Sequence, residues 1–227
     1  MGCSAGSITS RLATMYPKST IHGCDIDEDS IKKAQENYAQ LKNLSFSVKD
    51  LCQDLSEWSG KFDLIVTFDV VHDLPFASRA LSQIRQTLKP GGQFIMIDIN
   101  AENSPARNPG SLYSVSLFHC MAQSLYYEGS EGLGTAWGKQ KAQTMLQQAG
   151  YSNIREVKSS SPLFMIFVSV RVSKYIGNSM NCRRITLNQG ERHLQDTPIF
   201  STYESRNPFD KVPSYYVAFG LDVDRAT

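Results

Sequence analysis

The chain has 227 residues, a formal net charge of +1 and 41% hydrophobic residues, a composition typical of an ordinary globular domain. This neutral balance disfavours nucleic-acid binding, because phosphate contacts need a concentrated excess of Lys and Arg. No run approaches the roughly 20 apolar residues of a membrane span, and the first residues lack a secretory signal pattern. We therefore expect a soluble, cytoplasmic protein without a nucleic-acid or membrane partner.

The five cysteines are scattered along the chain, without the short spacings of a Cys or His metal site. Free thiols in a reducing compartment, and no bound metal, are the prediction from this pattern. The sequence does not indicate an oligomeric state.

The chain begins with a glycine loop at residues 2–6, GCSAG, followed by apolar residues at Ile8, Leu12 and Met15. This pattern predicts a turn into a helix whose N-terminus faces a ligand, although a plain strand-to-helix turn is an equal alternative. Ser4 and Ser7 stand where a dinucleotide-binding loop would have glycines, which argues against NAD.

Strand-like and helix-like segments then alternate up to about residue 172. We predict strands over residues 19–25, 44–50, 61–71, 92–100, 152–160 and 163–172. Helical periodicity follows the loop and recurs over residues 31–41, 77–88 and 142–149. This alternation indicates an α/β fold with a doubly wound, mostly parallel sheet.

Polar residues stand where two of these strands end. Asp25 closes the first strand about twenty residues after the loop, where an acid can bind a ribose, although a helix cap is the alternative. Asp69, His72 and Asp73 follow the third strand, where burial without partners would be costly. His72 beside Asp73 can serve as a general base, or His72 can simply bond a loop carbonyl.

Two segments depart from the alternation. Residues 101–134 are too long for an ordinary connection and contain an aromatic-rich stretch that can form a helix over the carboxyl edge of the sheet. Residues 173–227 are polar, with one strand-like stretch at 214–223, and we predict a tail of uncertain order that follows a domain at residues 1–172.

Together these segments resemble the class I S-adenosylmethionine-dependent methyltransferases, in the expected order and spacing over residues 1–172. The segments that carry the likeness are the loop GCSAG, Asp25, VKDL, FDLIVTFDVVHDL, LKPGGQFIMID and the closing strand pair. The resemblance implies a Rossmann-like fold with a C-terminal antiparallel strand, S-adenosylmethionine as cofactor, and a small-molecule acceptor.

The resemblance also assigns residues. The cofactor would be held by Gly2, Cys3, Ser4 and Gly6 in the loop, Asp25 and Ile26, Asp50 and Leu51, and Phe68 and Asp69. His72 and Asp73 would remove a proton from a hydroxyl acceptor, while Tyr113 and His119 would line the acceptor pocket.

The chain further resembles one subgroup of this family, whose members carry an N-terminal winged-helix domain. The segments that carry this likeness are FDVVHDLP and GLGTAWGKQKAQTMLQQAGYSNIR. In this family a central strand precedes the glycine loop, and Met1 stands where that strand would end. We therefore expect an N-terminally truncated chain whose neighbouring strands lack a partner. A catalytically inactive remnant that serves as a binding module is the alternative function.

Overall fold

A computed structural model describes residues 1–172. The predicted tail at 173–227, including its strand-like stretch, lies outside the described residues. The strands are β1 (Ile21–Asp25), β2 (Leu44–Val48), β3 (Phe62–Phe68), β4 (Leu88–Ile99), β5 (Ser152–Val157) and β6 (Phe164–Val170). The longer helices are α1 (Ser7–Met15), α2 (Glu28–Asn37), α3 (Ala77–Thr87) and α6 (Lys139–Gln148).

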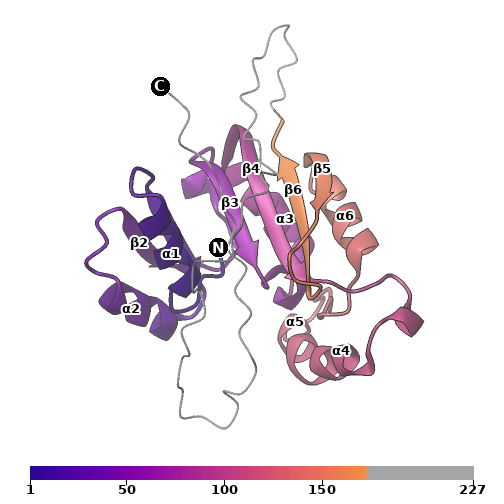
Figure 1. The fold of residues 1–227 in the computed structure, drawn as a ribbon. Coiled ribbons are helices and arrows are strands. Elements are labelled where there is room, and N and C mark those ends of the chain that lie inside the picture. The colour runs from indigo at the N-terminus through magenta and orange to yellow at the C-terminus, as the bar shows by residue number, and fades with distance from the viewer. Residues whose placement is uncertain (173–227) are drawn as a thin grey trace, which may run out of the picture. The chain divides into compact units, whose positions relative to one another are not determined.

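The strands form two sheets among the described residues. β1 pairs with β2 in parallel, and a four-stranded sheet has the order β3-β4-β6-β5. β3 and β4 are parallel, whereas β6 runs antiparallel to both β4 and β5. This arrangement confirms the predicted α/β fold of mostly parallel strands with an antiparallel C-terminal strand (Figure 1).

A short stretch at the N-terminus joins the two sheets. The Met1 ammonium donates to the Val66 carbonyl of β3 at 2.8 Å, and the Cys3 amide donates to the Cys24 carbonyl of β1 at 2.9 Å. No other strand lies between β1 and β3 in the part of the chain that the structure describes. The first three residues therefore contact both sheets.

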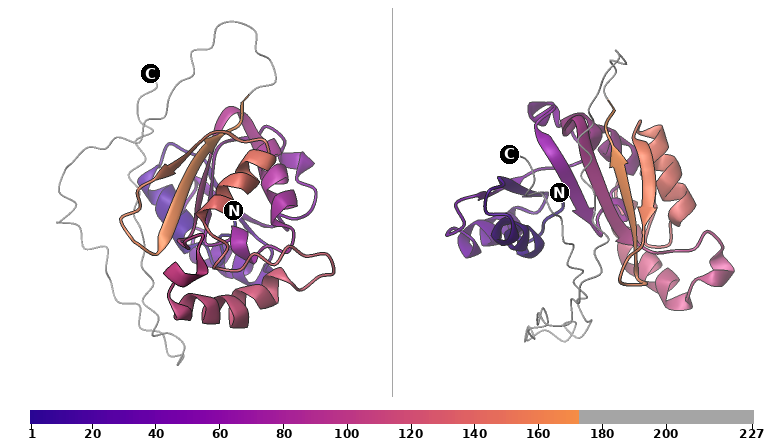
Figure 2. Two further views of the ribbon diagram at one scale, coloured as in Figure 1. Left: turned by 90° about the vertical axis from the view of Figure 1, so that its right-hand side faces the viewer. Right: turned by 45° about the horizontal axis from the view of Figure 1, so that its top comes forward.

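Each sheet is covered by its own helices. α1 and α2 pack on β1 and β2, whereas α3 and α6 pack on the four-stranded sheet (Figure 2). Leu81 and Ile84 of α3, Leu146 of α6, and Phe94 and Met96 of β4 are fully buried in one hydrophobic core. The core thereby fixes β3 and β4, whose ends carry the polar residues of interest.

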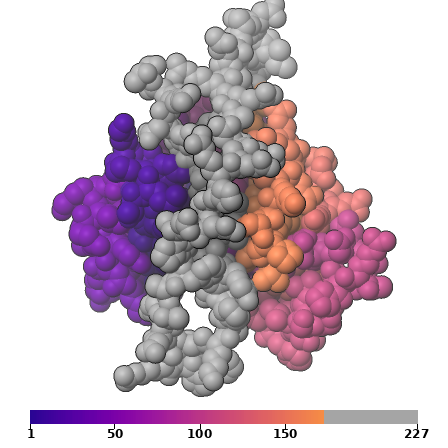
Figure 3. Space-filling model, viewed as in Figure 1, coloured from indigo at the N-terminus to yellow at the C-terminus, as the bar shows by residue number. Residues whose placement is uncertain are grey.

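The segment at 101–134 forms broken helices at the carboxyl ends of β3 and β4 (Figure 1). α4 (Gly110–Val115) continues through a π-helical turn, η4 (Ser116–Cys120), into α5 (Met121–Ser124). The segment forms the pink surface at the lower right of Figure 3 and exposes Phe118 and Tyr126. A short 3-10 turn, η2 (Val71–Asp73), follows β3 and contacts α5. In the described residues, no helix has the length and hydropathy to cross a membrane.

Candidate functional site

The glycine loop is tightly held between the two sheets. Gly2 and Gly6 have φ angles of 68° and 84°, the left-handed region that glycine adopts without strain. A Cβ atom on Gly2 would lie 2.4 Å from Cγ2 of Val70, and one on Gly6 would lie 2.7 Å from Cζ of Phe46. Both positions therefore require glycine, for conformation and for space.

The loop leads into α1 with its amide groups available. The N-cap residue of α1 is Gly6, and no side chain caps this helix. The first N–H groups of a helix lack partners within it and carry partial positive charge. The start of α1 can therefore receive a negatively charged group.

Asp25 closes β1 and holds the loop. Its carboxylate accepts the Ser4 amide through Oδ2 at 2.7 Å and the Asp27 amide through Oδ1 at 3.1 Å. The cap of α2 is Asp27, whose side chain accepts the Ser30 amide at 3.0 Å. Asp25 is therefore not the helix cap, and it keeps lone pairs for a ligand.

The next predicted residues lie at the ends of β2 and β3. Asp50 comes after β2 and accepts the Cys52 amide at 2.8 Å, while Leu51 is buried. Phe68 ends β3 and packs on Phe164, with ring centroids 4.9 Å apart. These positions lie beyond the carboxyl ends of parallel strands, where open α/β sheets bind ligands.

Two further predicted residues lie beside these strand ends with exposed side chains. Asp69 has a positive φ of 59°, and its side chain is 44% exposed. Ile26 leaves an apolar side chain 64% exposed directly after Asp25. The predicted cofactor residues therefore present a carboxylate and an apolar side chain at the surface.

His72 is the centre of a buried polar cluster in the turn after β3. Its side chain is 2% exposed, and its Nδ1 lies 2.7 Å from Oδ1 of Asp98, which is fully buried. Its Nε2 lies 3.2 Å from Oδ1 of Asp73, and Asp69 lies 3.7 Å from Nδ1. The structure thus brings together the three polar residues predicted after β3 and adds Asp98.

The carboxylates determine the charge of His72. Burial alone would lower the pKa of the imidazole, but Asp73 and Asp98 beside the two ring nitrogens outweigh burial and raise the pKa to about 12. A carboxylate that accepts Nδ1–H also fixes the orientation of the ring. Within the cluster, Asp73 and Asp69 are the members that solvent reaches, with side chains 26% and 44% exposed.

Two residues that contact His72 were not predicted from the sequence. Asp98 lies in β4, and Cys120 comes from η4, where the π-helical turn buries its thiol beside the imidazole. A charged residue inside the apolar run FIMIDI is the signal that indicates Asp98, because a buried carboxylate needs a partner. No spacing rule indicates Cys120.

The two predicted acceptor residues lie on the segment at the sheet edge. Tyr113 accepts Nδ2 of Asn108 at 2.9 Å, so its hydroxyl bonds within its own segment. Burial raises the pKa of Asp69, and exposed His119 opposes that rise electrostatically, which places His119 near the cluster. Their contact with an acceptor stays a prediction.

Comparison with known proteins agrees with this arrangement. Residues 1–150, more than half of the chain, match the family profile described as a methyltransferase domain. The trans-aconitate 2-methyltransferase of Deinococcus radiodurans is 35% identical over 92 residues, which are 40% of this chain and 33% of that protein.

Solved structures show the same fold. The carbon methyltransferase CurJ matches with a TM-score of 0.61 and 18% identity, over 76% of this chain and 47% of that chain. Human N-acetylserotonin methyltransferase in complex with SAM matches with a TM-score of 0.57 and 20% identity, over 76% and 46%. The chain therefore spans less than half the length of each relative.

The family match and these neighbours support S-adenosylmethionine as the cofactor. The winged-helix subgroup and the truncation stay predictions. The chain belongs to the methyltransferase domain family, and it has the Rossmann-like fold of S-adenosylmethionine-dependent methyltransferases.

Proposed function

We propose that this chain transfers a methyl group from S-adenosylmethionine to a small-molecule acceptor that carries a removable proton. The observation that carries the proposal is the bond of 2.7 Å from the Ser4 amide to Asp25, which couples the glycine loop to an acid at the end of β1. The family match covers the glycine loop and the ends of β1, β2 and β3. It gives no support to the alternative that the chain is catalytically inactive.

The residues at the strand ends fit the cofactor. S-adenosylmethionine supplies a methyl group activated by a positively charged sulfur. The uncapped start of α1 suits its carboxylate, and the free lone pairs of Asp25 suit ribose hydroxyls. Exposed Ile26 offers an apolar surface to a purine ring.

The acceptor would lie against the cluster after β3. His72 is too buried to touch a molecule directly, whereas Asp73 and Asp69 are accessible. We assign proton removal from a hydroxyl or an acidic carbon to Asp73, whose carboxylate lies 3.2 Å from Nε2 of His72. Since methyl transfer is an in-line displacement, alignment of the acceptor by these groups supplies most of the acceleration. A carbon acceptor is consistent with the likeness to CurJ.

The first experiment is calorimetric titration of the chain with S-adenosylmethionine and S-adenosylhomocysteine, with circular dichroism to verify folding. Asp25→Ala should weaken binding by about 1 to 3 kcal/mol through lost hydrogen bonds. The matched control is Asp63→Ala, which removes an exposed carboxylate at the amino end of β3 and should leave the affinity unchanged. Equal affinities for the wild type and Asp25→Ala, or a folded chain that binds neither molecule, would overturn the proposal.

A further inference from the structure

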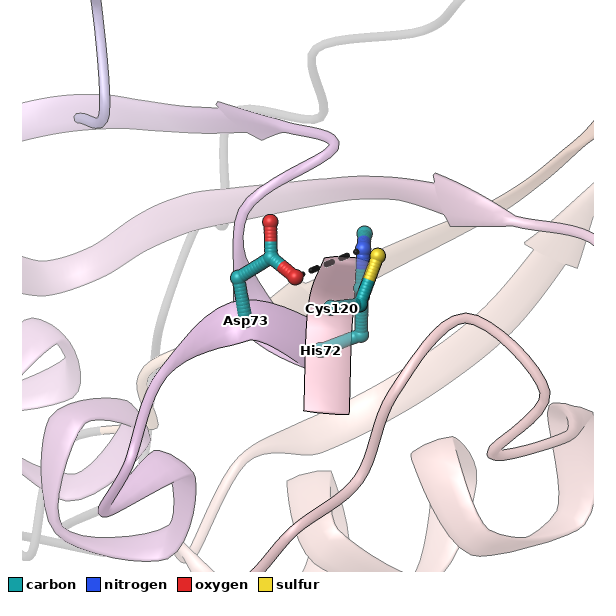
Figure 4. Close-up of side chains that lie close together, drawn as sticks. All are labelled: His72, Asp73 and Cys120. Atoms are coloured by element: carbon teal, nitrogen blue, oxygen red, sulfur yellow. Dashed lines mark ion pairs between the residues drawn. The ribbon is translucent and has the colours of Figure 1, made fainter. Parts of the chain in front are cut away.

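Three potential metal ligands converge at the turn after β3. His72 and Asp73 come from η2 and Cys120 from η4, and their side chains point toward one another (Figure 4). One ligand atom from each lies within 4.8 Å of the other two. His72 and Cys120 are 2% and 3% exposed, so two of the three are shielded from water.

The two sides of the His72 ring differ in geometry. Nδ1 and Oδ1 of Asp98 are 2.7 Å apart and form a hydrogen bond. Nε2 and Oδ1 of Asp73 are 3.2 Å apart, yet this buried oxygen has no hydrogen-bond partner among the described residues. The N–H direction at Nε2 therefore misses the carboxylate oxygen, although the two atoms are close.

A separation of 3.2 Å suits two atoms that share one ion. Zinc binds imidazole nitrogen at about 2.0–2.1 Å and carboxylate oxygen at about 2.0–2.2 Å. Two such bonds at a near-tetrahedral angle place the nitrogen and the oxygen a little over ~3 Å apart. The 2.7 Å contact with Asp98 is too short for such a bridge, so Asp98 belongs outside the ligand set.

We propose that His72 Nε2, Asp73 Oδ1 and Cys120 Sγ form a zinc-binding site, with Asp98 as the outer partner that orients His72. A carboxylate on the far nitrogen of a ligating histidine is the usual outer partner in zinc sites. The mixed nitrogen, oxygen and sulfur donors favour Zn²⁺ over Mg²⁺ or Ca²⁺, which prefer oxygen ligands. Three protein ligands leave a fourth position for water or another oxygen ligand.

The charge of the cluster is maintained when an ion binds. Asp69, Asp73 and Asp98 surround one imidazole, and no Lys or Arg forms an ion pair with them within residues 1–172. Buried carboxylates need a compensating charge. A divalent cation with a Cys120 thiolate would replace the positive charge of the protonated His72, so the charge of the cluster is kept and the Asp73 oxygen gains a partner.

The prediction of no bound metal rested on the absence of short ligand spacings in the sequence. The ligands of this site do not follow such a spacing. Two ligands are adjacent at 72–73, and the third lies more than forty residues later in a π-helical turn. The site goes beyond the proposed function and shares Asp73 with it, so metal binding and cofactor binding are measured separately.

The test is metal binding by the full chain after removal of metals with a chelator. Co²⁺ is the spectroscopic probe for a thiolate ligand, and Zn²⁺ affinity is measured by competition with a chromophoric chelator. We expect one Co²⁺ per chain with a sulfur-to-cobalt absorption band that Zn²⁺ abolishes. Cys120→Ser should remove the band and weaken Zn²⁺ binding at least ~10-fold, and Asp98→Asn should weaken it about 10- to 100-fold.

The matched control is Cys52→Ser, which changes another buried free thiol outside the cluster and should bind both metals as the wild type does. Absence of the thiolate band in the wild type, or equal Zn²⁺ affinity of Cys120→Ser and Cys52→Ser, would overturn the site. S-adenosylmethionine titration of the same samples reads the cofactor site separately. A failure of the zinc proposal is therefore distinguishable from a failure of the proposed function.

Discussion

Replacing Gly6 by alanine tests whether the loop is built around the backbone. Gly6 has a φ of 84°, and a Cβ there would lie 2.7 Å from Cζ of Phe46 and 3.0 Å from Cβ of Ala34. Gly91 has a φ of 82°, but a Cβ there meets nothing within 4 Å. The pair Gly6→Ala and Gly91→Ala therefore shares the backbone strain and differs in the contacts.

The expected free energies follow from these two contributions. Left-handed backbone costs alanine about 1–2 kcal/mol, and the stiffer unfolded chain returns about 0.4–1 kcal/mol. Gly91→Ala should therefore lower the free energy of unfolding by at most about 1.6 kcal/mol. Gly6→Ala should lower it by a further 1–3 kcal/mol, roughly the cost of overpacking.

Urea unfolding followed by circular dichroism measures both variants, and calorimetry measures their affinity for S-adenosylmethionine. Gly6→Ala should also lose cofactor affinity, because the Phe46 ring can turn away but Cβ of Ala34, at 3.0 Å, cannot, so the loop shifts. Gly91→Ala should bind as the wild type does. Equal destabilisation of the two variants, or normal cofactor affinity of a folded Gly6→Ala, would refute the reasoning.

Three other predictions address the core, the alkaline limit and the acceptor. Leu81→Ala, at a fully buried position, should cost about 2–5 kcal/mol in urea unfolding, whereas Leu117→Ala, 63% exposed, should cost less than about 0.5 kcal/mol. Burial raises the pKa of Tyr151 above 10.0, so above about pH 10 ionisation favours the unfolded chain. The free energy of unfolding of Tyr151→Phe should therefore fall less steeply with rising pH than that of the wild type, by up to about 1.36 kcal/mol per pH unit. Parallel curves of unfolding free energy against pH would contradict this. Asp73→Asn should lower turnover of a proton-bearing acceptor by about 10²–10⁴-fold with unchanged cofactor affinity, and a full rate would remove Asp73 from the mechanism.

The local patterns of the sequence were sufficient for the elements. All six predicted strands are present. The apolar runs of β3, β4 and β6 favour buried strands. Asp27 caps α2 and leaves Asp25 at the strand end, one of the two alternatives that the sequence left open.

Long-range contacts were beyond those patterns. The pairing of His72 with Asp98 joins two strand ends 26 residues apart. The position of Cys120 depends on a π-helical turn, which adds a residue to the helix and has no sequence signal. Periodicity does not determine the separation of β1 and β2 from the other strands. The expectation that strands beside the glycine loop lack a partner came from the family resemblance alone.

The burial of His72 and Asp98 is itself evidence about function. Both side chains are at most 2% exposed, although desolvation of an ion pair usually costs as much as the attraction returns. Well-packed apolar side chains at these positions would make the sheet edge at least as stable. Stability therefore does not account for this pair. Its position does, because His72 lies against Asp73 in the turn after β3, Asp98 in β4 and the helical segment that carries Cys120, where the proposed function places the acceptor.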